Sequence, residues 1–150
     1  MPIQQRRIMR SIIVVNICLT FAAAIVICCM LPARVAVHAD ISHHVDRWGG
    51  KWELFVPAII TAVLQWLFYA FWKLIYSING IKTSEKLLLW SCAAVSAILS
   101  AIATGSAFGS YSFTWHGTPP KPAAAGLIFA IHFLFSAVLL LVGKKQDESR

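Results

Sequence analysis

Four stretches of about 20 predominantly apolar residues run through this chain of 150 residues, and they constrain its fold more than any other feature. They cover approximately residues 11–31, 54–78, 87–107 and 123–142. A helix needs about 20 such residues to cross the hydrocarbon core of a bilayer. Helices satisfy their own backbone hydrogen bonds in lipid, and these stretches lack the alternation of a barrel strand. The sequence therefore predicts an all-α fold, an integral membrane four-helix bundle in a single domain over residues 1–150.

The overall composition indicates the same class of protein. Apolar residues make up 59% of the chain and charged residues 13%, whereas soluble domains average about 45–50% and about 25%. These values exclude a disordered or collagen-like chain and argue against a soluble enzyme. No Walker, G-x-S-x-G, H-E-x-x-H or dinucleotide-binding motif occurs, so we expect neither enzymatic activity nor a cofactor.

The distribution of basic residues predicts the orientation in the membrane. Nine of the 13 Lys and Arg residues fall on the side of the two chain ends. The other four fall on the opposite side and are Arg34, Arg47, Lys51 and Lys121. The richer side is cytoplasmic by the positive-inside rule. We therefore expect both termini in the cytoplasm, outer loops over residues 32–53 and 108–122, and a location in the bacterial inner membrane. The net charge of +7 is thus explained by the lipid bilayer, not by a nucleic-acid partner.

One alternative concerns the first apolar stretch. It follows three arginines, as the core of a secretory signal does, and Val37-His38-Ala39 has the small residues of a cleavage site. The stretch is longer than the roughly 7–15 residues of a usual signal core, and Pro32 intervenes before that site. We therefore expect an uncleaved helix, whereas cleavage would leave three helices.

The connection over residues 32–53 carries the most distinctive pattern. Its notable residues are Pro32, His38, Asp46, Trp48, Gly49 and Lys51, and Pro57 follows early in the second apolar stretch. This pattern resembles a membrane-protein family of unknown function over about residues 12–75. The same family forms the N-terminal part of SdpI-like proteins, which are bacterial toxin-immunity factors. Ala36 and His43 depart from the proline and glycine that the family often has at these places.

The resemblance implies a small multi-pass membrane protein with an accessory, immunity or sensing role that acts through this first outer loop. It implies a peptide toxin or another membrane protein as the partner. The binding residues that it suggests are His38, Asp46, Trp48 and Lys51. Full SdpI-like proteins have further helices, so the resemblance covers only part of that architecture.

The same loop has two interpretations from its residues alone. Imidazole and carboxylate groups suit zinc, nickel or copper, and five potential ligands, His38, Asp40, His43, His44 and Asp46, lie within nine residues. The metal site that we consider is formed by the first four. His116 in the second outer loop could approach this set. The alternative is a polar loop in which Asp46, Arg47 and Lys51 pair with each other. In that loop Trp48 and Trp52 would lie at the membrane interface, and Gly49-Gly50 would form a tight turn with φ > 0.

Polar side chains inside the apolar stretches offer a second functional hypothesis. Asn16, Gln65 and His132 lie at membrane depth, where such groups usually face other helices or a water-filled path. His132, Gln65 and the serine and threonine residues of the third stretch could line the path of a small oligomeric transporter or channel subunit. The structural alternative is a neutral His132 that is hydrogen-bonded to Gln65 or to a serine. The six acidic residues all lie outside the apolar cores, so a proton relay lacks an acidic partner and we favour the structural interpretation.

The third apolar stretch has two neighbouring rows of small residues. One row is Cys92, Ser96, Ser100 and Thr104, and the other is Ala93, Ala97, Ala101 and Gly105. Such faces allow helices to approach closely, so we expect this helix to be the central one. A homo-oligomer formed through the same face is also compatible with the pattern. After this helix, Tyr111, Phe113 and Trp115 alternate, which would place them on one face of an extended segment.

Overall fold

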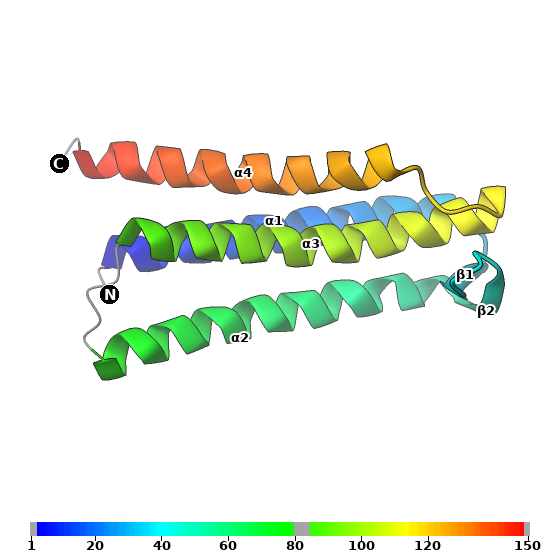
Figure 1. Ribbon diagram of the computed structural model, residues 1–150, viewed down its shortest axis with the longest axis horizontal. Helices are drawn as coiled ribbons and strands as arrows, with labels where there is room; N and C mark the ends of the chain where they lie inside the picture. The colour runs from blue at the N-terminus through cyan, green and yellow to red at the C-terminus, as the bar shows by residue number, and fades with distance from the viewer. Residues whose placement is uncertain (1–2, 80–84, 149–150) are drawn as a thin grey trace.

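The computed structural model describes residues 3–79 and 85–148 and contains four long helices and one β-hairpin (Figure 1). The helices are α1 (Ile3–Met30), α2 (Phe55–Asn79), α3 (Glu85–His116) and α4 (Pro122–Glu148). Between α1 and α2 lie the strands β1 (Arg34–Ala39) and β2 (Val45–Gly50) and a short 3-10 helix, η1 (Lys51–Leu54). The four expected helices are confirmed, but the fold is not purely helical. The expected turn that carries Gly80 and Lys82 lies outside the described residues.

Helices α1 and α3 form the middle of the bundle, with α4 on one side and α2 on the other (Figure 1). In the part of α3 that is apolar enough to cross a membrane, 44% of the residues are buried, against 28% or less in the corresponding parts of the other three helices. The reason is its row of small side chains, since Cys92, Ala93 and Ala97 are almost completely buried. The expectation of a central third helix is confirmed, and α1 shares this position because it also contacts each of the other helices.

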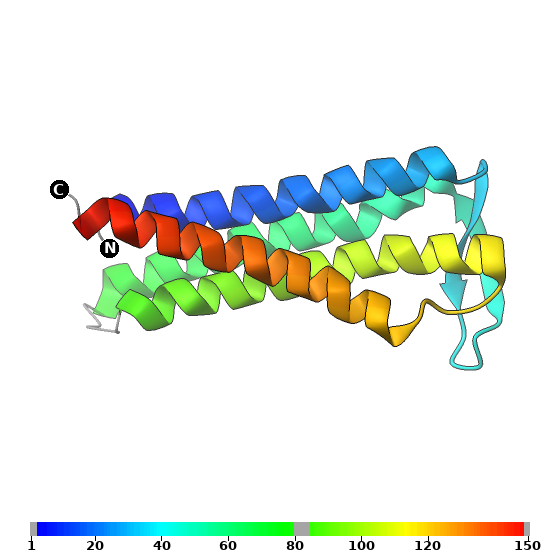
Figure 2. The same cartoon turned by 90° about the horizontal axis from the view of Figure 1, so that it is seen from above.

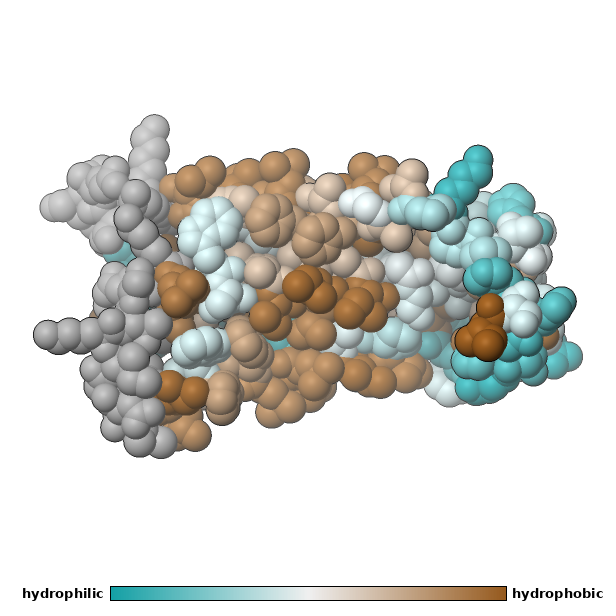
Figure 3. All heavy atoms as spheres, viewed as in Figure 1, coloured by the Kyte–Doolittle hydropathy of each residue, from teal (hydrophilic) through white to brown (hydrophobic). Residues whose placement is uncertain are grey.

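The outer surface of the bundle is apolar over most of its length. All four helices are long and apolar enough to cross a membrane. Large side chains such as Ile60, Leu67, Leu127 and Leu134 are more than half exposed. Figure 3 shows this apolar surface along the bundle and a hydrophilic surface at the end that carries the hairpin. These are the features of a multi-pass membrane protein, in which lipid covers the exposed apolar side chains.

Helix α3 is longer than the sequence indicated. It continues to His116, so the expected outer loop over residues 108–122 is reduced to residues 117–121, and the expected extended segment is helical. The extra turns gain tertiary packing, because Phe108 and Tyr111 pack against the hairpin. The helix ends at Gly117, whose φ is +64° and whose N–H donates to the Phe113 carbonyl at 3.1 Å. This left-handed C-cap favours glycine.

The expected first outer loop is an ordered antiparallel hairpin. Arg34 pairs with Gly50 at its base and Ala39 with Val45 near its tip, and irregularities in the register flank His38. An isolated two-stranded hairpin is marginally stable in water. This one packs on the end of the bundle through Val35 and Ala36, which are 0% and 3% exposed, and the Ala36 N–H donates to Thr114 Oγ1 of α3 at 2.9 Å.

The Gly49-Gly50 pair does not form the expected turn with positive φ. Gly50 is extended, with φ −80° and ψ 146°, and the only non-glycine residue with positive φ in the described chain is His43 at the hairpin tip. Gly49 is needed for space instead. A Cβ atom there would lie 2.8 Å from Glu53 Cδ and 3.1 Å from Val37 Cγ1. The absence of a side chain lets the Glu53 carboxylate approach the strand.

Candidate binding surface on the hairpin cap

We call β1, the turn over residues 40–44, β2 and η1 the cap, and its most prominent polar contact joins the two strands near the tip. His38 Nδ1 of β1 lies 2.6 Å from Asp46 Oδ1 of β2. Both side chains remain accessible, with 63% and 49% of their surface exposed. The register irregularities on both sides of His38 bring it across the hairpin to Asp46. Two of the four expected binding residues therefore lie together.

The tip of the cap is organised by Asp40. Its Oδ1 accepts the backbone N–H groups of Ser42 and His44, each at 2.9 Å. The backbone N–H of His44 and, more weakly, that of Ser42 lower the pKa of the Asp40 carboxyl, with desolvation acting in the opposite direction. His43 adopts a left-handed conformation with φ 64°, and its ring lies 6.5 Å from the Phe113 ring of α3. Asp40 is therefore a structural residue of the turn.

The base of the cap depends on Glu53, which sequence reasoning did not select. Glu53 Oε2 accepts a hydrogen bond from Arg47 Nη2 at 2.6 Å, and its Oε1 accepts the Gly50 N–H at 3.2 Å. The expected pairing of Asp46, Arg47 and Lys51 with each other is therefore wrong, because Arg47 binds Glu53 and Asp46 binds His38. A glutamate three residues after the residue that precedes a helix is a capping signal, and this signal could have identified Glu53.

The four expected binding residues do not converge on one point. Trp48 lies opposite Ala36 in the middle of the hairpin and is 46% exposed. Lys51 begins η1 at the base, at the far end of β2 from Asp46. The four residues are thus spread along the cap from the His38–Asp46 pair to the base.

The expected metal ligands are divided between separate contacts. His38 binds Asp46, while His44 Nδ1 lies 3.8 Å from Asp40 Oδ2 and His43 lies against Phe113. Within residues 3–79 and 85–148, no three His, Cys, Asp or Glu side chains are grouped so that they could hold a metal ion. His116 does not join them, since its ring packs on Tyr111 of its own helix at 6.2 Å.

The unpaired charge of the cap is positive. Asp46 binds His38, Glu53 binds Arg47, and Asp40 binds backbone N–H groups. Arg34 and Lys51 are exposed, and neither forms an ion pair with a carboxylate in the described part of the chain. Arg34 lies opposite Gly50 in the hairpin, and Lys51 follows Gly50 in the chain. These two cations could recognise a carboxylate or another anionic group.

In the membrane-spanning region, Gln65 links α2 to α3. Its Nε2 donates to Ser100 Oγ at 3.2 Å, and its Oε1 accepts a hydrogen bond from Ser96 Oγ at 2.5 Å. Gln65 is 2% exposed and both serines are 1% exposed or less. Both polar ends of this amide are therefore used between two helices.

His132 links α4 to α1 and α3. Its Nδ1 lies 2.9 Å from Asn16 Oδ1, and its Nε2 lies 3.1 Å from Thr104 Oγ1. Asn16 donates through Nδ2 to Ser136 Oγ at 2.8 Å, so its Oδ1 is the acceptor for His132 Nδ1–H. The contact of His132 Nε2 with the Thr104 hydroxyl is a further hydrogen bond, between α4 and α3. Among the described residues, the expected hydrogen bond between His132 and Gln65 is not formed. Hydroxyl groups of α3 bind both side chains instead, with Ser96 and Ser100 bound to Gln65 and Thr104 to His132.

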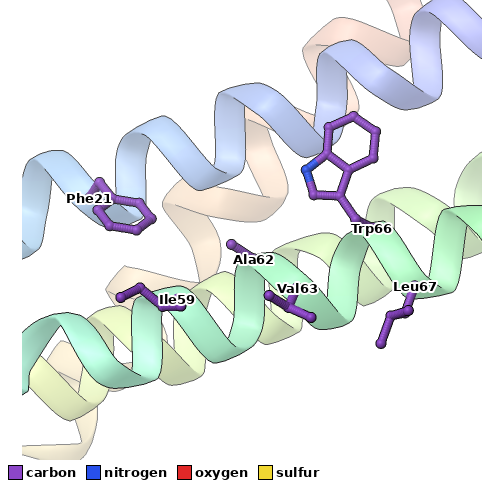
Figure 4. A pocket seen from close by; sticks show the side chains of 6 residues that line it. All are labelled: Phe21, Ile59, Ala62, Val63, Trp66 and Leu67. Atoms are coloured by element: carbon purple, nitrogen blue, oxygen red, sulfur yellow. The ribbon is translucent and has the colours of Figure 1, made fainter.

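A shallow groove of about 360 Å³ opens between α1 and α2 (Figure 4). The residues that line it are Phe21, Ile59, Ala62, Val63, Trp66 and Leu67. All of these side chains are apolar or aromatic, and the groove lies within two spans that are long enough to cross a membrane. The groove suits a hydrocarbon chain better than a polar ligand.

Together, these features define a multi-pass helical membrane protein whose bundle carries a polar β-hairpin cap at one end. Among protein families, the model of a domain of unknown function, DUF1648, matches residues 15–62. The matched segment runs from the middle of α1 through the whole cap into α2. Neither a curated protein nor a solved structure matches the chain.

Proposed function

We propose that this protein is an accessory membrane component related to SdpI-like immunity factors and that its cap binds a peptide toxin or another membrane protein. The observation that supports this proposal most strongly is the docked cap itself. It is held on α3 by the Ala36–Thr114 hydrogen bond, and it exposes His38, Asp46 and Trp48. The family match includes this whole segment. Exposed polar and aromatic side chains on a fixed scaffold are typical of binding surfaces.

The charges of the cap indicate which groups the partner would present. Arg34 and Lys51 both lie at the base of the hairpin, and neither has a carboxylate partner among the described residues. A carboxylate of the partner, such as an acidic side chain or a C-terminus, would form charge-assisted hydrogen bonds with them. Trp48 would supply an aromatic contact of the kind that is enriched at the centre of interfaces.

The test is survival of a bacterial host that is sensitive to secreted peptide toxins of the kind countered by SdpI-like proteins. We expect expression of the wild-type chain to raise the toxin dose that halves survival by at least about tenfold. Lys51→Glu should abolish most of this protection because it opposes an anionic partner. Lys51→Arg is the matched control and should retain protection. Killing that is unchanged by the wild-type chain would contradict an immunity role.

The intramembrane polar residues favour a structural role over a transport path. The bonds of Gln65 run between α2 and α3, and those of His132 run from α4 to α1 and α3. These hydrogen bonds cross the bundle between helices. In both side chains, each polar end already has a partner inside the protein. We therefore do not propose the transporter or channel hypothesis.

A further inference from the structure

The tip of the cap presents one large apolar side chain without cover from the rest of the described protein. Ile41 is 99% exposed, whereas Val35 and Leu54 of the same cap are 0% and 3% exposed. The neighbours of Ile41 in the chain, Asp40 and Ser42, are polar. Ile41 is therefore the most exposed large apolar side chain of the cap, where Trp48 and Trp52 are 46% and 67% exposed.

The turn that carries Ile41 is fixed by hydrogen bonds. The Asp40 N–H donates to the His44 carbonyl at 2.9 Å, and the His43 N–H donates to the Asp40 carbonyl at 3.0 Å. The Asp40 carboxylate accepts two further N–H groups, from Ser42 and His44. These four hydrogen bonds order the turn in which Ile41 is exposed.

The depth of the tip follows from its contact with α3. The ring of His43 lies 6.5 Å from Phe113, and Trp115 is two residues further along the same helix. Trp115 and Trp90 are 55% and 44% exposed on the surface of α3. The helical rise places them about 38 Å apart along the axis, between the thickness of the hydrocarbon core, about 30 Å, and that of the whole bilayer, about 40–45 Å. They have the spacing of the two interfacial tryptophan belts, and the tip lies at the depth of one of them.

The tip also projects sideways. Figure 2 shows that the hairpin lies across the end of the bundle and that its tip extends past the side of the helices. In a membrane this side is covered by lipid, because the exposed side chains of the helices there are apolar. A residue at the depth of a tryptophan belt and beyond the side of the bundle meets the interface of the bilayer.

We propose that Ile41 inserts into the lipid interface and that the hairpin tip is a membrane anchor that fixes the cap relative to the bilayer. The occupant of this surface is the lipid leaflet on the side of the cap. Two hydrogen-bonded N–H groups shield the Asp40 carboxylate, which makes this turn compatible with the headgroup region. The proposal is independent of the partner that the rest of the cap binds.

The test uses the full chain in phosphatidylcholine–phosphatidylglycerol vesicles. The four free cysteines, Cys18, Cys28, Cys29 and Cys92, are replaced by alanine, and Ile41→Cys is labelled with bimane. We expect phosphatidylcholine that carries a nitroxide at acyl carbon 5 to quench the bimane fluorescence at least about threefold more strongly than it quenches bimane-labelled glutathione. We expect aqueous iodide to quench it at least about threefold less strongly than it quenches bimane-labelled glutathione. Ile60→Cys, on the lipid-facing surface of α2, is the matched reference for burial in lipid.

A second label keeps the test independent of one variant. Ser42→Cys should respond to a nitroxide on the lipid headgroup, because this residue adjoins Ile41 in the same turn. If both labels are quenched by iodide as strongly as bimane-labelled glutathione and not by either lipid, the tip lies in water and the anchor is excluded. That result would make Ile41 available to a protein partner instead.

Discussion

Asn16 shows how single polar residues hold this bundle together in an apolar environment. Its side chain donates to the Ile12 carbonyl and to Ser136 Oγ, and it accepts from His132. Each bond satisfies a group that would be costly to leave unpaired in lipid. Interhelical bonds of this kind contribute about 0.6 kcal/mol on average in membrane proteins. Asn16 therefore stabilises the contact of α1 with α4 as part of a network.

A double-mutant cycle tests this network. We expect His132→Ala and Asn16→Ala each to lower the free energy of unfolding by about 1–3 kcal/mol, because each leaves buried partners without a hydrogen bond. Their coupling energy should be about 0.6 kcal/mol and at most about 1.7 kcal/mol. The measurement is reversible unfolding in mixed micelles. Cys92→Ala, combined with His132→Ala, is the control and should show no coupling, and strict additivity of the first pair would contradict the network.

The turn at Asp40 predicts a dependence on pH. The pKa of this carboxyl is lowered in the folded protein, mainly by the His44 N–H. A lowered pKa stabilises the turn at pH values above the unfolded pKa of about 3.9, and this contribution is lost as the pH falls through the folded pKa. We expect the amide NMR shifts of Ser42 and His44 to titrate with a midpoint below 3.9. Asp40→Asn should remove this transition, and a midpoint above 3.9 would contradict the proposed hydrogen bonding.

At the scale of elements, the cap and α3 are stabilised by each other. The outer turns of α3 provide Phe108 and Tyr111 as a surface for Val35 and Leu54. In return, the hairpin covers apolar side chains at the end of the bundle. Two-stranded hairpins and the frayed ends of helices are both weak structures alone. Their docking explains why both are ordered here.

Substitutions at Gly49 and Gly109 distinguish a glycine that is needed for space from one that only adds conformational freedom to the backbone. We expect Gly49→Ala to destabilise the protein by about 1–3 kcal/mol, because the new methyl group would meet Glu53 and Val37. Gly109→Ala, in α3, meets nothing within 4 Å and should stabilise it by about 0.5–1 kcal/mol. Unfolding midpoints measure both. Equal effects of the two substitutions would show that Gly49 is not needed for space.

The sequence predicted the helices well and the cap poorly, for physical reasons. Runs of about 20 apolar residues without strand alternation span lipid as helices, so the apolar character of residues such as Ile60 and Leu134 was enough to predict the four helices. The end of α3 could not be predicted in this way, because the continuation of the helix past Gly105 and Gly109 depends on tertiary contacts with the hairpin. The His38–Asp46 pair also depends on a register that single residues do not specify. The proposed pairing of Arg47 failed because Glu53 was the better-placed carboxylate.

At the scale of the whole molecule, the two ends of the bundle differ in structure. The cap lies at one end, and the beginning of α1 and the end of α4 lie at the other (Figure 1). The positive-inside rule predicts that the second end faces the cytoplasm. The proposed binding role requires this orientation, because a secreted toxin meets the cap only from outside the cell.

Labelling of intact cells tests this requirement most directly. In a chain without native cysteines, Lys51→Cys in the cap and Arg7→Cys near the beginning of α1 are each treated with a membrane-impermeant maleimide. We expect Lys51→Cys to be labelled at least about tenfold more in intact cells than Arg7→Cys, and both to be labelled equally after the cells are opened. Labelling of Arg7→Cys but not of Lys51→Cys in intact cells would place the cap in the cytoplasm and contradict the proposed function.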